Sequence, residues 1–296
     1  MRKDRILRKT ALFLCLFTLF FIISSCKRVE LPELPSETSE AEDIGAVAFS
    51  YEEIPPYLIY PYTEVNGGRP FFDAEDIPEP GIYLSDLDGL GRAGQAMCVI
   101  GREDMPKEER GEIGMVKPSG WRISRYDFID GTYLYNRCHL LGYQLTGLNA
   151  EEENLITGTR YMNVHGMLPF ENDIAYYLRY SDMHVCYRVT PVYVKDEPVA
   201  RGVLMEAMSV EDKGKSLLLC VFCYNVQPGV SIEYGDGSNE ERETSYELHM
   251  TDKEYHQKNC KKIISVPDEE KQLFSGDTDM LRENGFTPCR DCIPEG

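Results

Sequence analysis

A single amphipathic helix pattern among strand-like segments is the feature that most constrains the fold. Residues 169–178 begin with proline, carry acids in the first turn and place apolar residues at core spacing, as a helix does. Residues 131–141 alternate apolar and polar side chains before becoming apolar, which is typical of a strand entering a core. Residues 184–193 and 216–226 are apolar runs that suit buried strands. This succession predicts an α+β fold.

The N-terminus has the organisation of an export signal. Basic residues precede an apolar run over residues 11–23, which is too short for an ordinary membrane-spanning helix. The ending Ile23-Ser24-Ser25-Cys26 resembles a bacterial lipoprotein signal. The resemblance implies that residues 1–25 are removed and that a lipidated Cys26 anchors the protein on the outer face of the bacterial cell membrane. The alternative is an ordinary signal peptide with an incidental cysteine.

The segment after Cys26 is rich in Glu, Pro and Ser and contains few basic residues. Such a composition does not bury enough apolar surface to fold. We therefore expect residues 26–58 to be a disordered acidic tether. A second change of composition, to polar and turn-forming residues, occurs near residue 238. It predicts a larger domain over residues 59–238 and a small module over 239–296.

The net charge of −19 disfavours a protein that holds nucleic acid through a strongly basic surface. The balance is closer between residues 120 and 180, where every basic residue is an arginine, the side chain best suited to forked phosphate contacts. These residues are Arg122, Arg125, Arg137, Arg160 and Arg179. The charge pattern therefore predicts modest rather than tight affinity for nucleic acid.

Four short motifs occur in order in the middle of the chain. They are Tyr135–Leu140, Glu153–Ile156, Tyr161–Asn163 and Pro169–Asn172. Together they resemble the DNA/RNA non-specific endonucleases of the ββα-metal, or His-Me finger, superfamily, and especially the DNA-entry nucleases. The resemblance implies a ββα core around a mixed or antiparallel sheet, and hydrolysis of phosphodiester bonds in DNA and RNA without sequence preference.

The resemblance also implies a role for five residues. His139 would be the general base, since an imidazole is mostly neutral at pH 7 and can take a proton from water. Asn163 would bind Mg²⁺, or Mn²⁺ in its place, and Glu171 would accept hydrogen bonds from metal-bound water. Asn154 would help orient the site, and Arg137 would hold a phosphate oxygen.

The histidine motif departs from the family at two positions. The family more usually has Asp-Arg-Gly-His where this chain has Asn136-Arg137-Cys138-His139, so a side chain replaces a bare backbone position before the histidine. No catalytic group is lost. A different class of function is a catalytically idle nucleic-acid-binding surface lipoprotein, and the intact His139, Asn163 and Glu171 favour the enzyme.

The C-terminal segment carries a His-x3-Cys pair and a Cys-x2-Cys pair, formed by His256, Cys260, Cys289 and Cys292. Four such ligands suit a closed tetrahedral Zn²⁺ site with a structural role. The segment resembles the small metal-binding domain of the Ada DNA-repair protein, and we expect a zinc-ribbon-like module. The alternative is a disulfide between Cys260 and either Cys289 or Cys292, which export permits.

Overall fold

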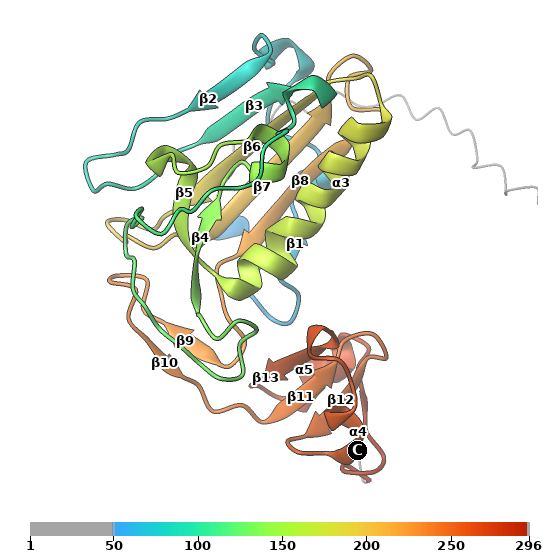
Figure 1. Cartoon of the computed structure of the whole chain (residues 1–296). Coiled ribbons are helices and arrows are strands. Elements are labelled where there is room, and N and C mark those ends of the chain that lie inside the picture. Colours follow the sequence, from blue (N-terminus) through green and yellow to red (C-terminus); the bar gives the residue numbers. More distant parts are fainter. Residues whose placement is uncertain (1–48, 50, 295–296) are drawn as a thin grey trace, which may run out of the picture. The chain divides into compact units, whose positions relative to one another are not determined.

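The computed structural model of the chain describes residue 49 and residues 51–294 (Figure 1). The expected signal peptide, Cys26 and most of the expected tether lie outside these residues. Within the described part, no helix is both long and apolar enough to cross a membrane.

The largest element is a six-stranded sheet in which every neighbouring pair is antiparallel. Its strands, in spatial order, are β1 (Tyr62–Glu64), β8 (Leu218–Tyr224), β7 (Gly202–Ser209), β6 (Val185–Val192), β3 (Ala96–Ile100) and β2 (Gly81–Leu84). The two predicted buried strands are therefore confirmed as β6 and β8. All residues of β7 are buried, which explains why the central strands are apolar on both faces.

A hairpin and a helix pack together beside this sheet (Figure 1). Strands β4 (Tyr135–His139) and β5 (Leu155–Thr159) pair antiparallel, and α2 (Tyr143–Thr146) lies between them in the chain. A π-helical turn, Met162–Met167, leads directly into α3 (Leu168–Tyr180). The predicted strand and helix are thus confirmed, in the order β, β, α.

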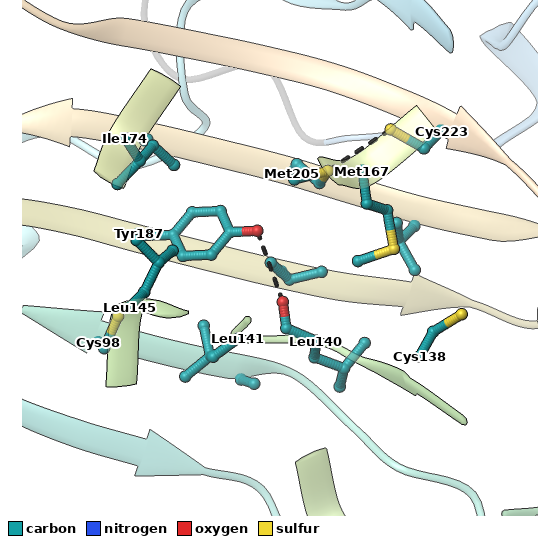
Figure 2. Close-up of a cluster of buried hydrophobic side chains, with 14 of the residues drawn as sticks. Cys98, Cys138, Leu140, Leu141, Leu145, Met167, Ile174, Tyr187, Met205 and Cys223 are labelled. Carbon is teal, nitrogen blue, oxygen red and sulfur yellow. Dashed lines mark hydrogen bonds between the residues drawn. The ribbon is translucent and has the colours of Figure 1, made fainter. Parts of the chain in front are cut away.

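The main core lies between α3 and the sheet. Ile174 and Leu178 of α3 are buried against Tyr187 and Val189 of β6. Figure 2 shows the Tyr187 hydroxyl pointing to the carbonyl oxygen of Leu140, at 3.5 Å. The residue that follows His139 is therefore part of the core.

A fully buried asparagine joins the β4–β5 hairpin to the sheet. Asn225, which follows β8, accepts a hydrogen bond from the Thr159 amide at 2.8 Å. Its own amide donates to the carbonyl oxygens of Thr157 at 3.1 Å and Ala200 at 2.9 Å. Because a buried amide is costly to leave unpaired, these three bonds hold the hairpin in one position relative to the sheet.

The chain before β1 packs on the sheet. Phe49, Tyr51 and Tyr57 contact Phe222 and Tyr224 of β8. The hydroxyl of Tyr224 also donates to the carbonyl oxygen of Pro55 at 2.7 Å. This packing lies within the range 26–58 for which the sequence predicts a tether, so ordered structure starts earlier than expected.

The C-terminal residues form a four-stranded sheet with an apolar core to which Ile59 also contributes. Its strands are β13 (Lys271–Phe274), β11 (Tyr246–His249), β12 (Glu254–Gln257) and β14 (Thr287–Pro288), accompanied by α4 (Lys261–Ile264) and α5 (Thr278–Glu283). Strand β10 (Asn239–Glu241) pairs with β9 (Val230–Ile232), so pairing with the preceding part continues past residue 238. Short 3-10 turns span Tyr51–Glu53, Asn66–Gly68, Ala74–Asp76, Arg102–Asp104, Glu152–Asn154 and Asp268–Glu270.

A buried hydrogen-bond network links the C-terminal sheet to the residue before the π-helical turn. The hydroxyl of Tyr161 lies 2.7 Å from Gln272 Oε1 and 3.0 Å from the carbonyl oxygen of Ile59. Gln272 donates to that same carbonyl at 2.9 Å. The three residues are all buried, and the Tyr57 hydroxyl joins the network by accepting from Gln272 at 3.2 Å.

Candidate active site

His139, the last residue of β4, is held in one tautomer. Its Nε2 lies 2.8 Å from the carbonyl oxygen of Asn149. Because a carbonyl oxygen only accepts, Nε2 carries the hydrogen and Nδ1 has the free lone pair. The ring is 7% exposed, and this burial lowers the pKa of His139, an effect that the Asn149 bond opposes and the charge of Arg110 reinforces. The ring is thus neutral near pH 7.

Arg110 contacts the imidazole of His139. No sequence pattern pointed to this arginine. Its Nη2 lies 3.3 Å from Nδ1 of His139, as a donor facing that lone pair. Its positive charge also acts on Glu171 and counters the effect of burial on that carboxyl group. Arg110 belongs to the irregular segment between Asp104 and Tyr135, where no periodic pattern or motif marks it.

Glu171 lies in the first turn of α3 and is 9% exposed. Burial raises the pKa of its carboxyl group to about 7. Gly142 makes this position available, because a Cβ on residue 142 would lie 2.6 Å from Glu171 Oε2. Residue 142 must therefore be glycine for the carboxyl group to approach the backbone just after His139.

Asn154 holds the same stretch of backbone from the other side. Its side chain is fully buried and bonds both polar groups of Leu141, accepting from the amide at 2.9 Å and donating to the carbonyl at 3.0 Å. The Leu140 amide donates to the backbone carbonyl of Asn154 at 2.9 Å. Asn154 therefore acts on the backbone next to His139 and does not contact the imidazole.

Arg137 differs from expectation. Its guanidinium donates to the carbonyl oxygen of Gly114 at 2.8 Å and to that of Val116, and it stacks over the ring of Trp121 at 4.1 Å. These contacts tie the irregular segment 114–121 to β4. Arg110, rather than Arg137, is the arginine in contact with the catalytic histidine candidate.

The cysteine before His139 is accommodated by a glycine on the neighbouring strand. Cys138 is fully buried, and burial raises the pKa of its thiol. A Cβ on Gly158 of β5 would lie 2.4 Å from the Cys138 sulfur. The side chain that departs from the family pattern thus fills the space above a glycine and leaves the backbone of β4 regular.

Asn163 lies in the π-helical turn directly before α3, and its side chain is half-buried. Its side-chain amide makes no hydrogen bond to any residue in the described part of the chain. A free amide oxygen and a nearly buried carboxyl group on the adjoining helix are the oxygen donors that Mg²⁺ prefers. The residues present therefore fit such an ion.

The four predicted zinc ligands come together. One ligand atom each from His256, Cys260, Cys289 and Cys292 lies within 4.8 Å of the others. Nδ1 of the buried His256 has no hydrogen-bond partner, and its Nε2 lies 3.2 Å from Glu254 Oε2 without hydrogen-bond geometry, which is unusual for a buried imidazole and fits a metal ligand. The cysteines in residues 51–294 are all free thiols in the structure. The cluster is compatible with a zinc module.

Comparison with solved structures identifies the fold. The chain is similar to NucA from Streptococcus agalactiae without metal, with a TM-score of 0.56 and 21% identity over 65% of this chain and 92% of that chain. The magnesium-bound form of NucA gives a TM-score of 0.56 and 20% identity over 63% and 90% of the two chains. A structure of Sda1 nuclease with bound zinc is 27% identical, with a TM-score of 0.47, over 55% and 82%. The NucA likeness confirms the ββα-metal fold.

A family model matches the central part of the chain. No curated protein matches the chain. Residues 76–211, which contain β4, β5, α3 and all five expected active-site residues, match the family described as DNA/RNA non-specific endonuclease. Residues 76–211 are therefore a DNA/RNA non-specific endonuclease domain, and the chain is a nucleic-acid-hydrolysing enzyme.

Proposed function

We propose that the protein is a Mg²⁺-dependent endonuclease that hydrolyses DNA and RNA without sequence preference, with His139 as its general base. The observation that carries this proposal is the fixed tautomer of His139. Its Nε2 hydrogen is bonded to Asn149, so the Nδ1 lone pair faces Arg110 in a site that also contains a buried carboxyl group.

His139 would take a proton from the attacking water at Nδ1. Its lowered pKa keeps the imidazole neutral, and the Asn149 carbonyl stabilises the imidazolium that forms, because the bond to Nε2 is stronger when the ring is charged. Arg110 occupies the Nδ1 lone pair in the absence of substrate. We propose that its guanidinium moves to a phosphate oxygen when substrate binds, which frees Nδ1 for water.

Asn163 would hold Mg²⁺ through its amide oxygen, and Glu171 would orient the waters of the ion. When bound, Mg²⁺ supplies charge stabilisation at the phosphate and the leaving oxygen. Asn163 is uncharged, so it would leave the charge of the ion undiminished. Groups of this kind contact phosphate and not base edges, which supports cleavage without sequence preference. The name of the matching family and the magnesium-bound NucA structure agree with this proposal.

The first prediction concerns the base and the metal ligand. We expect His139→Ala to lower cleavage of plasmid DNA and of RNA by about 10²- to 10⁴-fold, the usual contribution of a general base. Asn163→Ala should also be severe, but added Mg²⁺ should restore part of its activity, because the residue places the ion. The measurement is the initial rate against Mg²⁺ concentration for each variant.

His249→Ala serves as the control, since His249 pairs with Asp252 and Glu270 in the C-terminal sheet. It should keep the wild-type rate. Near wild-type turnover by His139→Ala would refute the assignment of the base. Nucleic-acid binding by the wild type without cleavage in Mg²⁺ or Mn²⁺ would favour the alternative, an idle binding lipoprotein.

The second prediction concerns pH. His139 must be neutral to act, so kcat/KM should rise with pH through the pKa of His139 and then level off. Because the charge of Arg110 lowers that pKa, Arg110→Gln should move the rise to higher pH. Arg110 also lowers the pKa of Glu171, so its removal should raise the pKa of that carboxyl group as well. The pH profile of kcat/KM measures this shift, and Arg242→Gln serves as the charge-matched control. A profile of Arg110→Gln that does not move from that of the wild type would exclude the electrostatic coupling between Arg110 and His139.

The third prediction concerns zinc. We propose that residues 239–296 form a module that holds one structural Zn²⁺ through His256, Cys260, Cys289 and Cys292, whose ligand atoms already lie within 4.8 Å of one another. Metal analysis of the purified chain should give one Zn²⁺, and His256→Ala should lose it and lower the melting temperature. A zinc-free protein in which Cys260 is oxidised would support the disulfide instead.

The fourth prediction concerns the N-terminus. We propose that the protein is exported and anchored to the membrane through a lipid on Cys26, on the basis of the signal-like residues 1–25. Cell fractionation should find the wild type with the membrane and Cys26→Ala either released or unprocessed. Membrane attachment of a fully processed Cys26→Ala protein would exclude the lipid anchor.

A further inference from the structure

A cleft of ≈ 460 Å³ opens beside the candidate active site. Arg102, Lys107 and Arg179 line it together with Tyr143 and Gln144 of α2. These residues come from three separate segments: the 3-10 turn at 102–104 and the chain after it, α2, and the end of α3. The cleft is therefore formed by the tertiary fold and is not a property of one loop.

The three cations of the cleft form no ion pair within the described part of the chain, which matters in so acidic a protein. Several other arginines are occupied by carboxylates, as Arg122 is by Asp236 at 2.8 Å and Arg160 by Asp130 at 2.6 Å. Three positive charges that no carboxylate neutralises therefore meet in one cleft.

The two acidic residues that follow Arg102 are directed elsewhere. Glu103 lies 3.5 Å from Nε2 of His184, and Asp104 accepts a hydrogen bond from the amide of Gly101 at 2.9 Å. Neither carboxylate neutralises Arg102 or Lys107. The cleft consequently presents donors and positive charge, which suit an anion with several acceptor oxygens.

The cleft is coupled by geometry to the active site. Gln144 forms part of its wall, and the Gln144 side chain donates at 3.0 Å to Asn172, the residue directly after Glu171. Arg179 and Glu171 lie on the same helix, eight residues apart. At a rise of about 1.5 Å per residue this places them about 12 Å apart along the axis of α3.

We propose that this cleft binds a backbone phosphate of the substrate strand, away from the phosphate that is cleaved. The inference rests on the proposed nuclease function. A separation of about 12 Å along α3 exceeds the spacing of adjacent phosphates on a strand, so the bound phosphate is not the direct neighbour of the cleaved one. The cleft thus makes the enzyme favour polymers over very short oligonucleotides, and it supplies the local positive charge that the chain as a whole lacks.

The first test measures binding without cleavage. The full chain is titrated onto a fluorescent 16-nucleotide single-stranded DNA in buffer without added Mg²⁺ at several salt concentrations. The triple variant Arg102→Gln, Lys107→Gln, Arg179→Gln should bind about tenfold more weakly. Its plot of log Kd against log salt should be flatter, by up to about one unit for each phosphate that the variant no longer binds.

The matched control neutralises three exposed cations outside the cleft: Arg69→Gln, Arg242→Gln and Lys215→Gln. It changes net charge equally and should bind as the wild type does. If both triple variants lose affinity to the same extent, a general electrostatic effect explains the loss and the cleft site is refuted. Unchanged binding by the cleft variant refutes it as well.

The second test uses turnover to separate a binding role from a structural one. The ratio of kcat/KM for the 16-nucleotide substrate to kcat/KM for a dinucleotide should fall about tenfold in the cleft variant and stay constant in the control. Equal losses on both substrates would mean that the cleft residues only shape the active site. A wild type that binds DNA through the cleft but cleaves nothing would refute the proposed function while leaving this inference standing.

Discussion

The active site depends on how tightly the backbone is fixed over the few residues that follow His139. Asn154 bonds both polar groups of Leu141, the Tyr187 hydroxyl reaches the carbonyl oxygen of Leu140, and Gly142 lies against the carboxyl group of Glu171. Each contact comes from a different element. The imidazole of His139 therefore projects from a segment that has little freedom to shift, which suits the general base that we propose.

Few charged groups determine the electrostatics of this site. A buried carboxyl group with a pKa of about 7 and a neutral imidazole share one nearby cation, Arg110. A divalent ion bound near Glu171 would favour its ionised form, so the unliganded site is poised to take up positive charge. In a chain of net charge −19, carboxylates neutralise several arginines such as Arg122 and Arg160, whereas the cations of the cleft form no ion pair among the described residues.

Much of the fold followed from the sequence, because the signals were local. The helix over 169–178 and the strands over 184–193 and 216–226 were confirmed within a few residues, since their periodicity reflects burial against one core. The histidine was correctly expected at a strand end. What could not be predicted depends on the fold: Arg110 lies in an irregular segment, and its contact with His139 exists only because that segment crosses the end of β4.

Three further features show the same limit. Arg137 was expected to face phosphate because it shares a strand face with His139, but the carbonyl oxygens of segment 114–121 compete for its guanidinium. The residue before His139 looked like a disturbance of the motif, and Gly158 on the paired strand absorbs it. Residues 49 and 51–58 resemble tether in composition, yet their aromatic side chains find partners on β8, which no local pattern reveals.

The buried hydrogen-bond network around Tyr161 makes the residues next to Asn163 depend on the C-terminal sheet. Tyr161 stands two positions before Asn163, and its hydroxyl shares buried bonds with Gln272 of β13 and with Ile59. Proteolytic removal of the C-terminal sheet would withdraw Gln272 and expose the base of the π-helical turn to water. Unfolding of the C-terminal sheet would therefore also destabilise the π-helical turn that contains Asn163.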